Sequence, residues 1–91
     1  MTEKRIDKIR HALVALEPIA LDIRDDSARH AGHEGAKDGR GHFHCRIVSD
    51  RFRNLSTVAR HRLVYAALGD LMNTDIHAFS IEAFDPEQIQ P

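Results

Sequence analysis

Two kinds of hydrophobic spacing follow one another along this chain, and their order leaves few folds open to it. Apolar residues recur at steps of three and four over residues 6–16 and again over residues 58–72, which is the spacing of an amphipathic helix. Apolar and polar residues alternate over residues 19–25, 42–49 and 76–84, which is the spacing of a half-buried strand. The sequence therefore predicts the order helix, strand, strand, helix, strand.

The apolar positions of these segments define the face of each that we expect in the core. By segment, the expected core residues are Ile6, Ile9, Leu13 and Leu16; Ile19, Leu21 and Ile23; Phe43, Cys45 and Ile47; Val58, Val64, Tyr65, Leu68 and Leu71; and Phe79 and Ile81. Pro18 ends the first helix, because the residue before a proline avoids helical backbone angles. Ser56 or Thr57 can cap the second helix, and Asp85 can cap one helical turn near the C-terminus.

The connections between the predicted strands indicate how the sheet is arranged. The first two strands most simply form an antiparallel hairpin, whereas a helix joins the second strand to the third, so these two can be parallel through a right-handed crossover. Parallel strands begin at the same end of a sheet. We therefore expect the connection over residues 25–41 to lie near His77, at the start of the third strand. His77 has the parity of Phe79 and Ile81, which predicts a position at the mouth of the core.

Residues 25–41 have no regular spacing and hold four of the five glycines. An irregular connection of this length in a small domain is usually functional or disordered, and we expect it to be flexible. It contains His30 and His33 at an H-x-x-H spacing, which by itself is a weak signal for metal binding and also fits two solvated side chains. We expect residues 1–91 to form a single domain, with residues 85–91 as a tail.

Composition argues against several classes of protein. The formal net charge is -1 with neutral histidines, so charge alone does not favour nucleic-acid binding. The single cysteine, Cys45, cannot form an internal disulfide, which favours a reducing compartment, and no apolar run approaches the roughly 18 residues of a membrane span. We expect a cytoplasmic monomer that does not bind membranes, with an organelle as the alternative location. No catalytic triad, glycine-rich phosphate loop or carboxylate pair indicates an enzyme.

The second half of the chain carries a specific family pattern. The run IVSDRFRNLSTVARHRLVYAALGDLM, followed by IHAFSIEA, resembles the BolA family: a strand ending in V-S, a phenylalanine turn, a V-x-R-H-R-x-V-Y helix and an H-A-x-S-I strand. The upstream HAGHEGA segment and the H-F strand start are similar to the family as well. One departure is Asn54, where the family often has glycine. Asparagine tolerates the left-handed backbone conformation, so the turn can survive.

The resemblance implies an α+β fold similar to a class II KH domain. That fold has the order α-β-β-α-β, with a three-stranded mixed sheet packed against helices on one face and a short helical turn before the second main helix. These implications agree with the elements predicted from the hydrophobic spacing. The GxxG loop of KH domains that bind nucleic acids is missing from this sequence.

The resemblance also implies a non-enzymatic partner of a monothiol glutaredoxin. Such proteins form a heterodimer that shares a [2Fe-2S] cluster, or an apo complex, in iron-sulfur cluster trafficking or iron regulation. The H-A-x-S-I match implies that His77 is one cluster ligand. The family takes the second ligand, a histidine or a cysteine, from the loop, which has no cysteine here, so His33 or alternatively His30 would serve. A glutaredoxin cysteine and a glutathione thiol would supply the other two of four ligands, and no cofactor is expected in the isolated protein.

The resemblance implies a second function, that of a DNA-binding transcriptional regulator. The candidate DNA-contacting residues are Arg51, Arg53, Arg60 and Arg62. Arginines near the start of a helix bind phosphates well, although an ordinary solvated basic face explains them too. No aromatic residues interleave with these arginines to stack bases.

A structural zinc site is the remaining alternative for the histidine-rich region. Its candidate ligands are His30, His33, His42 or His44, and Cys45. Structural zinc prefers two or more cysteines, and a strand points His44 and Cys45 to opposite faces. We therefore expect Cys45 to be a buried, inert thiol and His44 to lie on the surface. His42 starts the second strand, close to the proposed cluster site, where it could assist.

Overall fold

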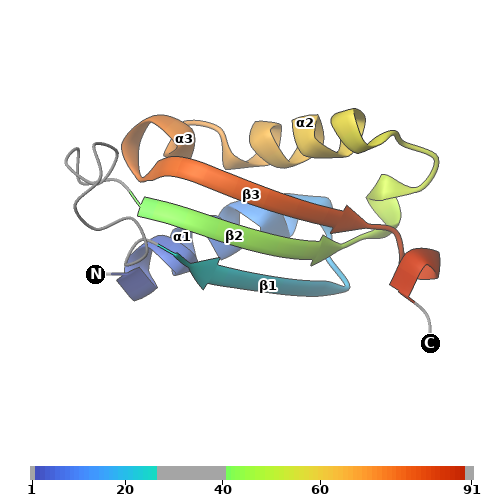
Figure 1. Ribbon diagram of the computed structural model, residues 1–91, viewed down its shortest axis with the longest axis horizontal. Coiled ribbons are helices and arrows are strands. Elements are labelled where there is room, and N and C mark those ends of the chain that lie inside the picture. Colours follow the sequence, from blue (N-terminus) through green and yellow to red (C-terminus); the bar gives the residue numbers. More distant parts are fainter. Residues whose placement is uncertain (1, 27–40, 90–91) are drawn as a thin grey trace.

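The computed structural model describes residues 2–26 and 41–89, which contain three strands and three α-helices. The elements are α1 Thr2–Leu13, β1 Ala20–Asp25, β2 Gly41–Val48, α2 Thr57–Leu68, α3 Leu71–Thr74 and β3 Ile76–Phe84. Their order is the predicted one, with the short helix α3 added before the last strand (Figure 1). None of the helices in this part of the chain is long and apolar enough to cross a bilayer.

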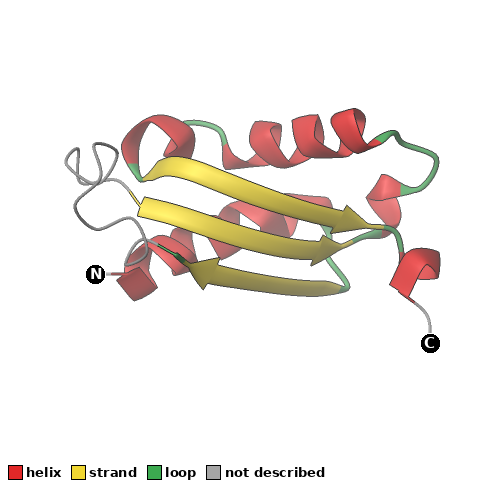
Figure 2. Ribbon diagram, viewed as in Figure 1, coloured by secondary structure: helices red, strands yellow, loops and turns green. Residues whose placement is uncertain are grey.

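The three strands form one mixed sheet in the order β1-β2-β3, with α1 and α2 packed against one face (Figure 2). β1 and β2 pair antiparallel, and β2 and β3 pair parallel. These pairings confirm the predicted hairpin and crossover, and the architecture is the expected α+β fold. Because β1 ends where β2 begins, both ends of their connection lie at the end of the sheet where β3 also begins.

A β-bulge in β3 lies at the start of the parallel pair. Gly41 is opposite Ile76. The next residue of β2, His42, is opposite Ala78, so His77 is the extra residue of β3. A bulge of this kind bends the strand and redirects a side chain, and bulges are common beside functional sites.

The bulge interrupts the alternation of buried and exposed side chains along β3. Ile76 and Phe79 are buried, while His77 and Ala78 between them are both exposed. The prediction that His77 shares the core-facing parity of Phe79 and Ile81 was therefore wrong. The physical reason is that one inserted residue shifts the two-residue period of every position before it.

The core lies between the sheet and the two long helices. Its buried residues are Ile9, Leu13, Leu16, Ile23, Phe43, Cys45, Ile47, Phe52, Val64, Leu68, Ile76 and Phe79, with Ile6, Leu21, Leu71 and Ile81 among the partly buried residues packed against them. Three expected core residues are exposed instead: Val58 by 59%, Tyr65 by 40% and Ile19 by 60%. α2 turns Val64 and Leu68 inward, four residues apart, which leaves Val58 and Tyr65 outside that stripe. Ile19 precedes the first residue of β1.

The turn from β2 into α2 has the expected form. A short 3-10 helix, Asp50–Phe52, buries the Phe52 ring, and Asn54 has a left-handed φ of 63°. Ser56 is the N-cap of α2, and its Oγ accepts a hydrogen bond from the Ala59 N–H at 3.1 Å. The helical turn that the family resemblance implied and the predicted cap are both present.

The segment after β3 also contains a predicted feature. Residues Pro86–Ile89 form one 3-10 turn. Asp85 caps it, because its Oδ1 accepts the N–H groups of Glu87 at 2.9 Å and Gln88 at 3.2 Å. The carboxylate thereby pairs N–H groups that a helix start leaves without intrahelical partners.

Candidate functional site

The starts of β2 and β3 form a rim that brings His42 and His77 together. Two backbone hydrogen bonds fix this rim: the Gly41 N–H donates to the Asp75 carbonyl at 2.9 Å, and the Asp26 N–H donates to the His42 carbonyl at 2.8 Å. Asp26 and Gly41 are the described residues on either side of the connection between β1 and β2. The two described ends of this connection therefore lie at the rim where β3 begins, as expected, while residues 27–40 of the connection lie outside the described residues.

The His42 and His77 rings are neighbours. Their centroids are 5.0 Å apart and their planes are inclined by 52°. His42 is only 9% exposed, whereas His77 is exposed. The place of His42 at the strand start predicts an assisting role for it. The ring contact itself depends on the parallel register and the bulge, which the alternation along a single strand does not reveal.

The loop histidines expected to complete the cluster site, His30 and His33, lie outside the described residues. Among residues 2–26 and 41–89, no group of three or more His, Cys, Asp or Glu side chains is arranged to hold a metal ion. The described part of the chain therefore contributes two neighbouring imidazoles to the rim, and further ligands have to come from elsewhere.

Asp75 lies beside the rim, but its carboxylate is held by other groups. Its Oδ1 accepts a hydrogen bond from the Thr74 hydroxyl at 2.6 Å, and its Oδ2 accepts one from Lys8 Nζ at 3.2 Å, with Arg5 Nε 3.6 Å away. The Thr74 hydrogen bond, followed by the Lys8 contact and the Arg5 charge, lowers the pKa of Asp75 below its usual range. This carboxylate links the end of α3, just before β3, to α1, and none of these contacts directs it to the two histidines.

Cys45 is the buried, inert thiol expected from the sequence. Its side chain is fully buried, and burial, followed by the charge of Asp22, raises its pKa to about 12. A thiol with this pKa is protonated at neutral pH, and the protonated form is a poor nucleophile and a poor metal ligand. His44, on the other face of β2, is hydrogen-bonded through Nε2 to Glu82 Oε2 at 2.6 Å. Both observations oppose a zinc site that includes Cys45 and His44.

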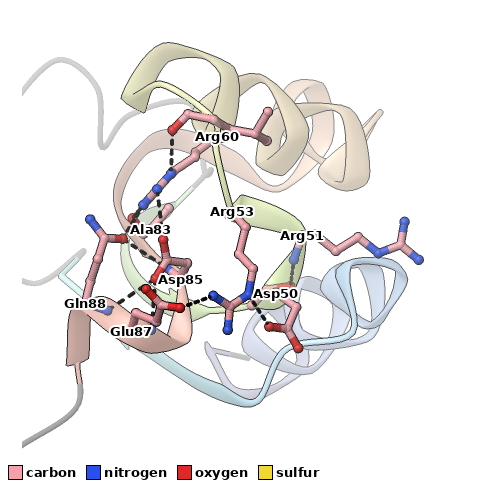
Figure 3. A network of polar contacts seen from close by, with 10 residues as sticks. Asp50, Arg51, Arg53, Arg60, Ala83, Asp85, Glu87 and Gln88 are labelled. Carbon is pink, nitrogen blue, oxygen red and sulfur yellow. Dashed lines mark hydrogen bonds and ion pairs between the residues drawn. The ribbon is translucent and has the colours of Figure 1, made fainter.

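Arg60 has a structural role that the sequence analysis did not anticipate (Figure 3). Its side chain is 11% exposed, and its guanidinium donates to the carbonyls of Leu55 at 3.0 Å and Ala83 at 3.1 Å. It also donates to the Gln88 amide oxygen and lies 3.5 Å from the Asp85 carboxylate. Arg60 thus fastens the start of α2 to the end of β3 and to the turn that follows.

The other candidate DNA-contacting arginines are exposed, and two of them are paired with carboxylates. The ion pairs are Arg51 with Glu17, and Arg53 with Asp50 at 2.8 Å and Glu87 at 2.9 Å. Arg62 is exposed on α2. The structure therefore does not gather the four arginines into one basic surface, because Arg60 points inward and carboxylates partly neutralise Arg51 and Arg53.

A family model described as BolA-like protein matches residues 13–88. The chain is 42% identical over 90 residues to Protein BOLA1, chloroplastic, of Arabidopsis thaliana, which covers 94% of this chain and 56% of that protein. It is 42% identical over 74 residues to BolA-like protein 1 of Homo sapiens, which covers 81% of this chain and 52% of that protein. The chain spans about half the length of these two relatives.

A bacterial relative and a solved structure extend the comparison. The chain is 36% identical over 72 residues to the DNA-binding transcriptional regulator BolA of Haemophilus influenzae, which covers 79% of this chain and 67% of that protein. The solved BolA domain of SufE1 from Arabidopsis thaliana matches with a TM-score of 0.79 at 42% identity, covering 91% of this chain and 93% of that one. With the fold and the family pattern of the sequence, these matches show that the chain belongs to the BolA-like protein family.

Proposed function

We propose that this chain is a non-enzymatic partner of a monothiol glutaredoxin and shares a [2Fe-2S] cluster with it, in iron-sulfur cluster trafficking or iron regulation. The observation that carries the proposal is the position of His77. It is the exposed, extra residue of a bulge, at the rim where the connection between β1 and β2 begins and ends. An imidazole in this position is open to a partner and to the cluster that the two proteins would share.

The ligands available in this chain fit a shared cluster better than a resident one. A [2Fe-2S] cluster needs four ligands, usually with thiolates among them. The described residues offer no group of three ligands, and the thiol of Cys45 is buried and protonated. In the proposed complex His77 and either His33 or His30 bind the cluster, and a glutaredoxin cysteine and a glutathione thiol complete it.

Visible spectroscopy tests this function directly. The chain is mixed with a monothiol glutaredoxin, iron, sulfide and glutathione without oxygen, and its spectrum is compared with that of the glutaredoxin homodimer. We expect a changed spectrum for the wild-type chain and the homodimer spectrum for His77→Ala. His44→Ala is the matched control, because His44 lies on β2 and pairs with Glu82 away from the rim. A wild-type mixture that gives only the homodimer spectrum would refute the proposal.

The second candidate function is that of a DNA-binding transcriptional regulator, which is the description of the Haemophilus influenzae relative. We propose that Arg51, Arg53 and Arg62 would contact phosphates in that case, since Arg60 is engaged inside the fold. Duplex binding with a steep dependence on salt, weakened by Arg62→Ala, supports this function. Equal binding by wild type and a variant lacking all three exposed arginines contradicts it.

The expected cytoplasmic location stays a prediction. The name of the Arabidopsis relative places that protein in the chloroplast. Fractionation of cells that express this chain with its native termini is the measurement that distinguishes the two locations.

A further inference from the structure

We propose that a hollow on the open face of the sheet binds a small zwitterion, namely an aliphatic amino acid such as leucine. The hollow has a volume of about 240 Å³ and is lined by Ala20, Asp22, Arg46, Val48 and Ile89. Asp22 would bind the ammonium group of the ligand, Arg46 would bind its carboxylate, and the three apolar residues would contact its side chain. The site requires neither a cluster nor a partner protein, and it lies where β2 ends, away from the rim where β2 and β3 begin.

Two opposite charges line the hollow without pairing with each other. Asp22 and Arg46 are opposite each other in the antiparallel pair of β1 and β2, and both are exposed on the face that α1 and α2 leave open. Opposite charges in such positions usually interact across the ladder. Here neither side chain has a hydrogen bond or an ion pair with another side chain of the described residues. A ligand placed between them can therefore use both.

The ring of Phe84 holds Arg46 in a different direction. The guanidinium carbon of Arg46 lies over this ring, 5.3 Å from its centroid, which is a cation–π contact. Stacking occupies the flat face of the guanidinium and leaves the N–H groups at its edges available. A guanidinium binds a carboxylate through two such N–H groups side by side. Phe84 thus positions Arg46 as a carboxylate-binding group beside the hollow.

The neighbouring charges on this face are engaged elsewhere. Glu82 is opposite Arg46 on the β3 side, but it is hydrogen-bonded to His44 at 2.6 Å. Arg24 lies two residues after Asp22, and its Nε donates to the carboxylate two residues further along at 2.8 Å. Asp22 and Arg46 therefore remain for a ligand. They repel a simple anion and a simple cation respectively, whereas a zwitterion satisfies both charges.

Aliphatic groups form the rest of the hollow. Val48 is only 3% exposed, and Ile89 belongs to the turn that follows β3 at the end of the sheet where β1 begins (Figure 1). Arg60 fixes this turn through its hydrogen bond to Gln88 (Figure 3), so Ile89 is a firm wall. The described residues around the hollow include no polar group besides the two charged ones, which favours an aliphatic ligand side chain.

The size of the hollow limits the ligand to a small molecule. A water molecule in the liquid occupies about 30 Å³, so the hollow has the volume of about eight water molecules. This volume suits a single small amino acid. Because both charges are exposed and water competes for them, we expect weak binding, with a dissociation constant on the order of 1 mM for leucine.

NMR titration of the isotope-labelled full chain with L-leucine tests the site. We expect the backbone signals of the residues that line the hollow to shift together. Asp22→Asn and Arg46→Gln should each weaken binding at least about tenfold, and Arg24→Gln should leave it within about twofold. Arg24 is the matched control, because it is exposed on the same face of β1 and already has a carboxylate partner. Equal affinity of the wild-type chain and Arg46→Gln, or a loss in Arg24→Gln as large as in Asp22→Asn, would overturn the proposal.

Three further ligands test the parts of leucine on the unmodified chain. Isocaproate lacks the ammonium group, isoamylamine lacks the carboxylate, and glycine lacks the side chain. Each should bind at least about tenfold more weakly than leucine, because each leaves one part of the hollow without its partner. Isocaproate that binds as tightly as leucine, or leucine shifts that do not include the residues of the hollow, would refute a zwitterion site.

Discussion

Arg60 is a charged residue that is buried on α2. In the sequence it belongs to an R-H-R run that indicates a basic surface. In the fold it lies four residues before Val64 and eight before Leu68, on the buried stripe of α2, and its guanidinium joins three segments. The available signal was the spacing of Arg60 from two core residues, four positions from Val64 and eight from Leu68. The sequence nevertheless favoured a surface position for Arg60, because charged side chains are seldom buried unless they are paired.

Replacement of Arg60 should therefore affect stability more than binding. Arg60→Ala removes four polar contacts, and the carbonyls of Leu55 and Ala83 lose the hydrogen-bond donor that Arg60 provides. We expect the free energy of unfolding to fall by about 2–4 kcal/mol, measured by urea denaturation.

Arg62→Ala, on the exposed side of the same helix, is the control for Arg60→Ala. It should change the free energy of unfolding by no more than about 0.5 kcal/mol. A loss for Arg60→Ala as small as that of this control would contradict the structural role assigned to Arg60.

Cys45 leads to a prediction about pH. Its pKa is raised from 9.0 to about 12 in the folded chain, so the unfolded chain ionises first and the folded chain holds the proton longer. The stability that the buried neutral thiol provides is fully present below pH 9 and is lost as the pH rises toward 12.

The contribution of Cys45 is isolated by comparison with Cys45→Ala, which lacks the thiol. The free energy of unfolding of the wild-type chain should decrease more steeply above pH 9 than that of the variant, by at most about 1.4 kcal/mol per pH unit. Parallel pH profiles, measured by urea denaturation at several pH values, would argue against a buried neutral thiol.

At the scale of elements, periodicity identified the three strands and both long helices that the described residues form. The third strand was predicted over residues 76–84, as found, and the hairpin and crossover followed from connection lengths. The bulge was missed, because a two-residue period assumes an unbroken ladder. The partner that forces the break, β2, is more than 30 residues earlier in the chain. The sequence therefore predicted the correct end of the sheet for His77, but not the face to which its side chain points.

The turn before α2 gives a prediction at this scale. Asn54 has a φ of 63°, a conformation that costs most residues about 1–2 kcal/mol and glycine almost nothing. We expect Asn54→Ala to lower the free energy of unfolding by about 1 kcal/mol, as measured by urea denaturation. Asn54→Gly, the residue often found in the family, should lie within about 0.5 kcal/mol of wild type. A smaller loss for alanine than for glycine would contradict this account of the turn.

At the scale of the molecule, the sequence predicted the architecture because local pattern and topology rules agree in a small α+β fold. The candidate site was harder to predict, because it combines residues from two strands with a connection whose histidines, His30 and His33, fall outside the described residues. That one of them lies close to His77 remains a prediction, and the shared cluster depends on it.

The proposed cluster sharing predicts the molecular mass of the chain alone and of its complex with glutaredoxin. The chain alone should elute as a monomer in size-exclusion chromatography with light scattering. With a monothiol glutaredoxin and a reconstituted cluster, one copy of each protein should elute together, because the cluster usually has thiolates among its four ligands and the single cysteine of this chain, Cys45, is buried. A stable homodimer of this chain that retains the cluster without glutaredoxin would contradict the proposal.

The bulge in β3 means that the site depends on the number of residues as well as on their identity. Substituting Ala78 leaves His77 in place, but deleting it would restore an unbroken ladder and bring His77 itself opposite His42. Such a variant would keep both histidines but would change the orientation of one relative to the other. Single-residue deletions along this strand would therefore test whether the site requires the extra residue of the bulge, which substitutions cannot test.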